Sequence, residues 1–179
     1  FGIKFRDENM YSIKCDTIGQ CWKDSVQTVL NHGETHHDED ISIREILGLS
    51  IEINNPNYKD SYISETGDPN VIKKMVSKFS KGITMDDRPF TYGQLIYDMD
   101  GVDQFEWMLQ RIKTKPETKS ATISLLTPGS NEQNIPCLNL LDVKLRNGKI
   151  HLQFFFRSQN IFGRQYANLV ALAYLHESL

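Results

Sequence analysis

The dipeptide Asn147-Gly148 constrains the fold of this chain more than any other feature of its sequence. It separates two strand-like segments, PCLNLLDVKLR and KIHLQFFFRS. Asn-Gly favours a type I′ turn, because both central residues of that turn need positive φ angles. A two-residue turn pairs Arg146 with Lys149 and thereby fixes every later pair along the two strands. The sequence therefore predicts a long antiparallel hairpin in one register.

The predicted register gives the hairpin one largely apolar face and one polar face. The polar face carries Asp142, Lys144, Arg146 and His151. The other face is apolar near the turn and becomes polar at its far end, with the predicted pairs Leu145–Ile150, Val143–Leu152, Leu141–Phe154, Asn139–Phe156 and Cys137–Ser158. Such alternation is typical of a strand pair with one buried face.

The far end of the hairpin carries residues with possible chemistry. Cys137 follows Pro136, and Arg157-Ser158 returns beside it. A guanidinium near a thiol stabilises the thiolate and makes it a nucleophile, and the arginine could equally bind a phosphate, with the Ser158 hydroxyl as a further donor. An inert buried cysteine and a surface arginine are the alternative reading. Strict pairing puts Arg157 on the face opposite Cys137, so a β-bulge is needed to bring the two together.

The remaining periodicity predicts a mixture of helices and strands. A first helix is expected to begin after Asp16-Thr17, at about residue 18, and to end at Gly33. A second is expected over VIKKMVSKFSKG. A third is expected over VDQFEWMLQRIKTKP, where Val102, Phe105, Leu109 and Ile112 share one face and Pro116 ends the helix. YANLVALAYLHES is apolar nearly all round and predicts a buried helix. Strands are expected at about 46–53 and 121–126, HHDEDIS is expected to be a polar loop, and residues 55–70 are left unassigned. The predicted fold class is α/β or α+β, with helices against a mixed sheet.

Composition limits the classes of function. The 179 residues suit one domain, and 39% hydrophobic residues are enough for a core. A net charge of −3 argues against a general nucleic-acid or membrane-surface binder, though not against a local anion site. No apolar run is long enough to span a membrane, and the first residues lack the apolar core of a signal peptide. The spacing of Cys15, Cys21 and Cys137 fits neither a disulfide framework nor a zinc site, so we expect a cytoplasmic protein without a metal.

Three further segments allow both a functional and a structural interpretation. HGETHHDED could bind a metal, but adjacent histidines point in different directions, which favours a solvated loop. Phe154-Phe155-Phe156 could be an aromatic binding platform or part of the core. Arg44 is either a surface charge or an anion contact.

Taken together, several segments resemble the thymidylate synthase family, especially its shorter archaeal-type branch. DTIGQCWKDSV, IREILGLSIEI, FTYGQL and VDQFEWMLQRIKTKPETKSATISLLTP are similar to successive family segments. The most specific segment is IPCLNLLDVKLRNGKIHLQFFFRSQNIFGRQYANLVAL. It resembles the family pattern of Pro-Cys, a hairpin, Arg-Ser and an Asn that opens the buried helix, with the same intervals. This resemblance favours the nucleophile interpretation of Cys137.

The resemblance implies a homodimer that methylates C5 of dUMP, with methylenetetrahydrofolate as the donor of carbon and hydride. Cys137 would add to C6 of the uracil. Arg157 and Ser158 would hold the phosphate, which Arg44 would contact from a mobile loop. Asn168 would read the uracil edge, since an amide can donate to O4 and accept from N3–H. Tyr92 would assist removal of the C5 proton.

Some positions depart from the family pattern. Asn160 stands where the family usually has an acidic residue that helps bind folate and organise protons. Lys119-Ser120 falls where the partner subunit usually lends an arginine pair, and lysine supplies a point charge without the bidentate fork. The resemblance also implies a catalytic glutamate in the middle segment, for which residues 60–82 offer Glu65. Residues 1–179 are expected to form one thymidylate synthase-like domain without the family's C-terminal segment.

These departures leave two alternatives to a dUMP-methylating enzyme. One is a C5 hydroxymethylase of cytidine or deoxycytidine nucleotides, although cytosine would call for an acidic reader in place of Asn168. The other is a non-catalytic nucleotide-binding relative.

Overall fold

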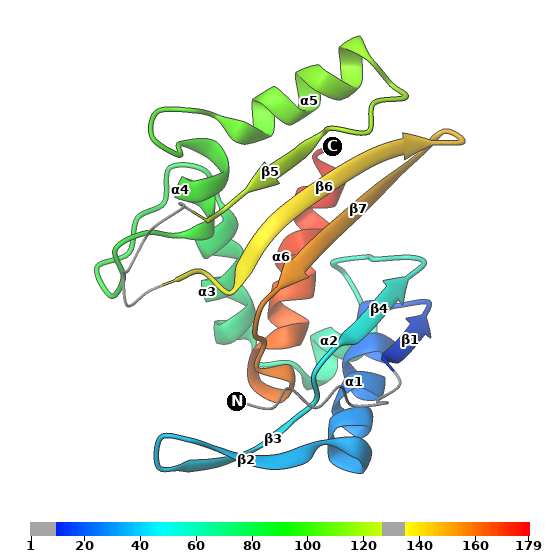
Figure 1. The fold of residues 1–179 in the computed structure, drawn as a ribbon, viewed down its shortest axis with the longest axis vertical. Helices are drawn as coiled ribbons and strands as arrows, with labels where there is room; N and C mark the ends of the chain where they lie inside the picture. Colours follow the sequence, from blue (N-terminus) through cyan, green and yellow to red (C-terminus); the bar gives the residue numbers. More distant parts are fainter. Residues whose placement is uncertain (1–9, 127–134) are drawn as a thin grey trace, which may run out of the picture. The chain divides into compact units, whose positions relative to one another are not determined.

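The computed structural model describes residues 10–126 and 135–179, which divide into two compact units at Thr66/Gly67. The first unit holds β1 (Tyr11–Cys15), α1 (Ile18–His32), β2 (Glu34–Asp38), β3 (Ile41–Glu45), β4 (Leu49–Ile53) and α2 (Ser61–Thr66). The second holds α3 (Pro69–Phe79), α4 (Tyr92–Tyr97), α5 (Gln104–Thr114), β5 (Thr122–Ser124), β6 (Leu138–Arg146), β7 (Lys149–Phe156), the π-helix η1 (Ile161–Gln165) and α6 (Tyr166–Glu177) (Figure 1). The predicted mixture of helices and strands is confirmed. The single-domain expectation stays a prediction.

The first unit contains a parallel strand pair and a separate hairpin. β1 pairs with β4, and β2 pairs with β3 in antiparallel register. The prediction of a polar loop over HHDEDIS was wrong, because residues 34–38 and 41–45 form this hairpin around a turn at Glu39, whose φ is 53°. The polar composition is explained by exposure: every residue of β2 is exposed.

Asp60 ties two helices of the first unit together. Its carboxylate accepts hydrogen bonds from the Gly19 amide near the start of α1 (2.9 Å) and from the Ile63 amide in α2 (3.0 Å). A carboxylate at a helix N-terminus satisfies amides that have no partner inside the helix. Burial opposes ionisation of Asp60, but these amides outweigh it and lower the pKa of the carboxyl. The predicted helix start is confirmed: Thr17 caps α1 by accepting from the Gln20 amide.

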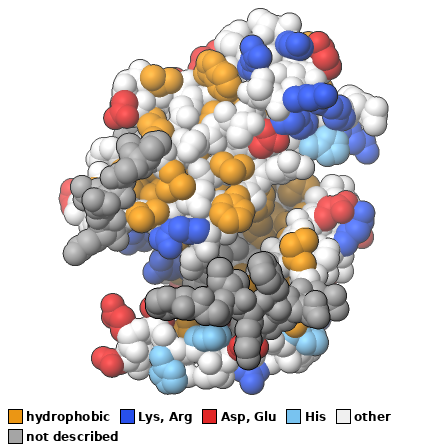
Figure 2. Space-filling view, viewed as in Figure 1, with side chains coloured by type: hydrophobic (Ala, Val, Ile, Leu, Met, Phe, Trp, Pro, Cys, Tyr) orange, Lys and Arg blue, Asp and Glu red, His pale blue; other side chains and the backbone are white. Residues whose placement is uncertain are grey.

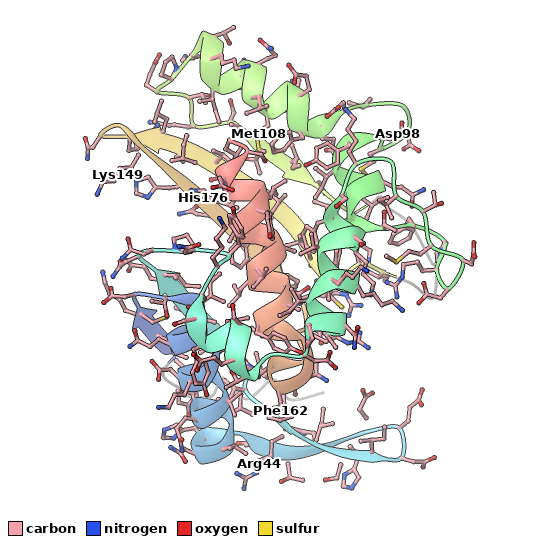
Figure 3. All side chains as sticks on the ribbon, turned by 180° about the vertical axis from the view of Figure 1, so that it is seen from behind. Arg44, Asp98, Met108, Lys149, Phe162 and His176 are labelled. Carbon is pink, nitrogen blue, oxygen red and sulfur yellow. The ribbon has the colours of Figure 1, made fainter. Side chains whose placement is uncertain are left out.

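The second unit is built on the three-stranded antiparallel sheet β5–β6–β7. α6 covers the face of the β6–β7 hairpin that is turned away in Figure 1 and toward the viewer in Figure 3. At the C-terminal end of α6, His176 lies 3.2 Å from the Ile150 carbonyl of β7 (Figure 3). Nine residues of α6 are buried, as the apolar sequence predicts. α3 packs along α6, and α5 packs on β5 with Phe105, Met108 and Ile112 buried.

Several predicted boundaries and contacts differ in detail. The predicted strands at 46–53 and 121–126 are shorter, at Leu49–Ile53 and Thr122–Ser124. Val102 precedes α5 and is exposed, so the buried face of that helix uses Met108 instead. Within the described ranges, no helix is both long and apolar enough to cross a membrane.

The hairpin register changes once, at a β-bulge. From Arg146–Lys149 to Leu140–Phe155 the pairs are those that the Asn-Gly turn predicts. Beyond Leu140 the register shifts by one residue, so that Leu138, not Asn139, pairs with Phe156. The Arg157 amide then donates to the Cys137 carbonyl at 2.9 Å, and the predicted pairing of Cys137 with Ser158 was wrong. The bulge therefore brings Cys137 and Arg157 opposite each other.

Candidate active site

A pocket of about 450 Å³ opens in the second unit where β6 begins and β7 ends. Its volume is within the usual range of small-molecule sites. Among the described residues it is lined by Met75, Lys78, Asp87, Arg88, Pro89, Phe90, Tyr92, Ile135, Pro136, Cys137, Arg157, Ser158, Gln159, Asn160, Arg164 and Asn168. In the space-filling view, basic side chains gather at this end of the hairpin beside hydrophobic ones (Figure 2).

Cys137 is half-buried at the pocket wall, directly before β6. The other two thiols belong to the first unit and are buried, and burial raises the pKa of both Cys15 and Cys21. A thiol in a hydrocarbon environment stays protonated and unreactive. Of the three cysteines, Cys137 is the one that lines this pocket, as a nucleophile requires.

Arg157 supports the segment that leads into Cys137. Its Nε donates to the Pro136 carbonyl (3.2 Å) and its Nη2 to the Ile135 carbonyl (2.8 Å). The Pro136 carbonyl also accepts from the buried Asn139 amide at 2.8 Å. The side chain of Arg157 is exposed, and its remaining N–H groups can reach an anion. Arg157 therefore combines a structural role with the capacity to bind a phosphate.

Tyr92 reaches the pocket from the first turn of α4. Thr91 and Gln94 form a capping box that fixes the start of this helix. Gly93 allows α4 to approach the end of α3, since a Cβ there would lie 2.1 Å from the Ser80 carbonyl oxygen. The Tyr92 hydroxyl accepts a hydrogen bond from the Leu138 amide at 3.4 Å. Burial, followed by the neighbouring Cys137, raises the pKa of Tyr92, which therefore keeps its proton at neutral pH.

Asn168 and Asn160 both line the pocket, but their side chains differ in hydrogen bonding. Asn168 lies in α6 with 6% of its surface exposed, and its Oδ1 has no hydrogen-bond partner among the described residues. An unpaired buried acceptor costs roughly 1–3 kcal/mol, which a ligand N–H would recover. Asn160 instead caps η1, accepting from the Gly163 amide at 2.7 Å. An amide can hold this turn but cannot take up or release a proton at neutral pH.

Six of the predicted site residues thus line one pocket: Cys137, Tyr92, Arg157, Ser158, Asn160 and Asn168. Lys119 is exposed between α5 and β5 and does not line it, so its contribution to a partner's site stays a prediction. Arg44 belongs to the first unit. It lies on β3 and donates to the Leu30 carbonyl of α1 (Figure 3), so the expectation of a loop position was wrong. Glu65 is exposed on α2.

Sequence reasoning missed three cations in the pocket, namely Lys78, Arg88 and Arg164. Lys78 could have been found, because it follows Met75 by three residues and so shares the apolar face of an amphipathic helix. Arg88 and Arg164 lie in segments without a periodic pattern. Within the described residues, the histidines and carboxylates of HGETHHDED form no group that could hold a metal ion.

No protein-family model matches the chain, but individual proteins do. Proteins named "Putative thymidylate synthase" from Methanosarcina mazei and Methanothermobacter thermautotrophicus are 32% and 30% identical to it over 170 and 182 residues. Both alignments cover 92% of this chain, and they cover 78% and 82% of the two relatives.

A viral protein and a solved structure are also similar. The deoxyuridylate hydroxymethyltransferase of Bacillus phage SP01 is 23% identical over 207 residues, which are 95% of this chain and 54% of the viral protein. The crystal structure of thymidylate synthase from T4 phage gives a TM-score of 0.43 at 30% identity, over 47% of this chain and 30% of that one.

Proposed function

The chain belongs to the thymidylate synthase family, and from this membership we propose that it methylates the uracil of dUMP at C5, with methylenetetrahydrofolate as co-substrate. The observation that carries the proposal is the pocket in which an accessible thiol, a guanidinium and an unpaired buried amide meet. These three groups match a nucleophile, a phosphate site and a reader of the uracil edge.

The proposed reaction begins with attack of the Cys137 thiolate on C6 of the uracil. The new C–S bond moves electron density to C5 and O4, so that C5 becomes nucleophilic. Arg157 and Ser158 hold the phosphate. The folate supplies the one-carbon unit and the hydride. After C5 has gained its new bond, its proton leaves and the C–S bond breaks, which returns the thiolate.

Two neutral groups would orient the base and guide the proton. Asn168 would donate to O4 and accept from N3–H, which would satisfy its buried Oδ1. Tyr92 stays protonated at neutral pH and would pass the C5 proton through its hydroxyl and water. Because Asn160 caps η1 and cannot exchange protons, the proton path is proposed to use Tyr92 without it.

The residues present suit an anionic folate. The described part of the pocket lining has four cationic side chains and one carboxylate, in a chain whose net charge is −3. The family resemblance also implies a homodimer. Phe155, which is exposed on the face of β7 opposite to that of the buried Leu141, supports a sheet-to-sheet interface.

Incubation with 5-fluoro-dUMP and methylenetetrahydrofolate tests the proposal. We expect a covalent adduct on Cys137 by mass spectrometry, none with Cys137→Ser, and dihydrofolate as the co-product with dUMP. Without the adduct and without dihydrofolate, the proposal fails.

A second candidate is hydroxymethylation of the same base, which the similarity to the phage SP01 protein favours. The adduct would still form, but the folate product would be tetrahydrofolate, and the nucleotide would gain a hydroxymethyl group. Comparing tritium release from C5-labelled dUMP, dCMP and CMP separates the uracil and cytosine alternatives.

A further inference from the structure

Lys78 is a buried lysine on α3 that projects among the pocket residues. Only 7% of its surface is exposed, and none of the described residues forms an ion pair or hydrogen bond with its side chain. Lysine is rarely buried without a partner, because removing an ammonium group from water is costly. The group that compensates this charge is therefore expected to come from a ligand.

Two arginines lie close enough to Lys78 to interact with it. Arg88 and Arg164 both line the pocket, and burial together with these two charges lowers the pKa of Lys78. Asp87 is the one carboxylate among the described lining residues and partly offsets these charges, but it already bonds Lys74 (3.0 Å) and Arg88 (3.3 Å). The Arg164 side chain has no hydrogen bond or ion pair with the residues that the structure describes. Among the described residues, the three cations thus face one carboxylate, Asp87, which leaves a net positive charge.

Arg157 is held differently. Two of its nitrogens donate to the carbonyls of Ile135 and Pro136, next to Cys137. The strongest electrostatic effects on Lys78 come instead from Arg88 and Arg164. Among the described lining residues, one cation is thus anchored beside the nucleophile, and two of the other three, Arg88 and Arg164, act on the third, Lys78.

We propose that Lys78, Arg88 and Arg164 form a second anion-binding locus, which holds a carboxylate or phosphate group other than the nucleotide phosphate on Arg157. The proposal rests on the proposed function for the assignment of that first phosphate to Arg157. The second anion has two possible sources. It is either a carboxylate of the folate or a second phosphate of the nucleotide.

Calorimetric titration of two variants tests the locus. Lys78→Met keeps the length of the side chain, and Arg164→Gln keeps hydrogen-bonding capacity. Lys73→Met, at an exposed position on the same helix, is the matched control. Each protein is titrated with dUMP, with dUDP, and with methylenetetrahydrofolate after saturation with dUMP. Thermal denaturation verifies that each variant is folded.

We expect dUMP to bind all four proteins within about twofold of one another. One of the other two ligands should bind Lys78→Met and Arg164→Gln about tenfold more weakly than wild type, as loss of a charge-assisted hydrogen bond implies. A loss confined to folate identifies its carboxylate, and a loss confined to dUDP identifies the second phosphate. Unchanged affinity for both ligands overturns the proposal, as does an equal loss for dUMP, which would merge the two loci into one.

Failure of the proposed function gives a different result. If wild type binds no dUMP, that function falls, and a titration with inorganic phosphate followed by phosphorus NMR judges the locus alone. Weaker phosphate binding in Lys78→Met and Arg164→Gln than in Lys73→Met then supports it. Equal binding in all three overturns it.

Discussion

The amide of Arg157 donates to the carbonyl of Cys137 across a distance of 2.9 Å, one residue out of step with the rest of the hairpin. The bulge between Leu138 and Leu140 makes this pairing possible. A bulge that redirects a strand beside a site is a common device in β-structure. Here it brings the guanidinium of Arg157 to the segment that holds the thiol.

Asn139 is the extra residue of the bulge, and its replacement tests this arrangement. Asn139→Leu removes the hydrogen bond to the Pro136 carbonyl. Losing one hydrogen bond of about 1.4 kcal/mol predicts about tenfold slower adduct formation with 5-fluoro-dUMP. Because Arg157 remains, dUMP affinity should stay within about twofold. A lower affinity with an unchanged rate would contradict a positioning role for Asn139.

Asn168→Asp should change the preference between bases. The carboxylate cannot donate to O4 of uracil but can accept from the 4-amino group of cytosine. We expect dUMP binding to weaken at least about tenfold, and tritium release from C5-labelled dCMP to rise relative to dUMP. An unchanged ratio of the two release rates would mean that Asn168 does not contact the base.

Asp60→Ala should destabilise the first unit by about 2 kcal/mol, since two helix N-termini lose an acceptor. Urea denaturation measures this loss, with the exposed Asp98→Ala as the control. Because the folded pKa of Asp60 is lowered, its stabilisation is present above the unfolded value of 3.8 and is lost as the pH falls through the folded pKa. The difference between wild type and variant should therefore shrink in acid. A difference that is constant with pH would exclude the charge as its source.

Lys78→Met should raise the melting temperature at neutral pH. Burial and two arginines lower the folded pKa of Lys78, so its charged form favours the unfolded chain. This cost is fully present below the folded pKa and disappears as the pH rises toward the unfolded value of 10.5. Calorimetric melting across that range should show the advantage of the variant decreasing. Lys73→Met should show no such trend.

Phe155→Glu should weaken the predicted homodimer. Phe155 is 55% exposed on β7, opposite Leu140. Burying a charge in place of this aromatic ring costs several kcal/mol, enough to shift a dimer toward monomers at micromolar concentration. Light scattering after gel filtration measures the mass. Trp107→Glu on α5, where an aromatic is also exposed, should leave the mass unchanged. A wild-type monomer would refute the predicted assembly.

The sequence predicted the elements that depend on local chemistry. Asn147-Gly148 fixed the hairpin register as far as Leu140, and Thr17 marked the start of α1. A bulge was predicted as the condition for bringing Cys137 and Arg157 together, but its position was not, because no local signal at the far end of the hairpin fixes it. The β2–β3 hairpin escaped prediction because its exposed strands lack apolar alternation.

The residues of the candidate site also differ in how far the sequence predicted them. Cys137 and Arg157 were predicted from the far end of the hairpin, and Asn168 from the resemblance, which covers one continuous segment. Lys78, Arg88 and Arg164 come from separate segments and meet only in the folded unit. Of these three residues, only Lys78 could be recognised from the local sequence, because it places a charge on the apolar face of α3.

The wide turn η1 has a consequence for Asn168. A π-helical turn takes up one residue more than an α-helical turn, and each residue of an α-helix rotates the next by about 100°. Deleting one residue from Ile161–Gln165 would swing the amide of Asn168 around the axis of α6 and leave Ala167 or Leu169 nearer its place. The number of residues between Arg157 and Asn168 therefore determines whether an amide or an apolar side chain of α6 faces the pocket.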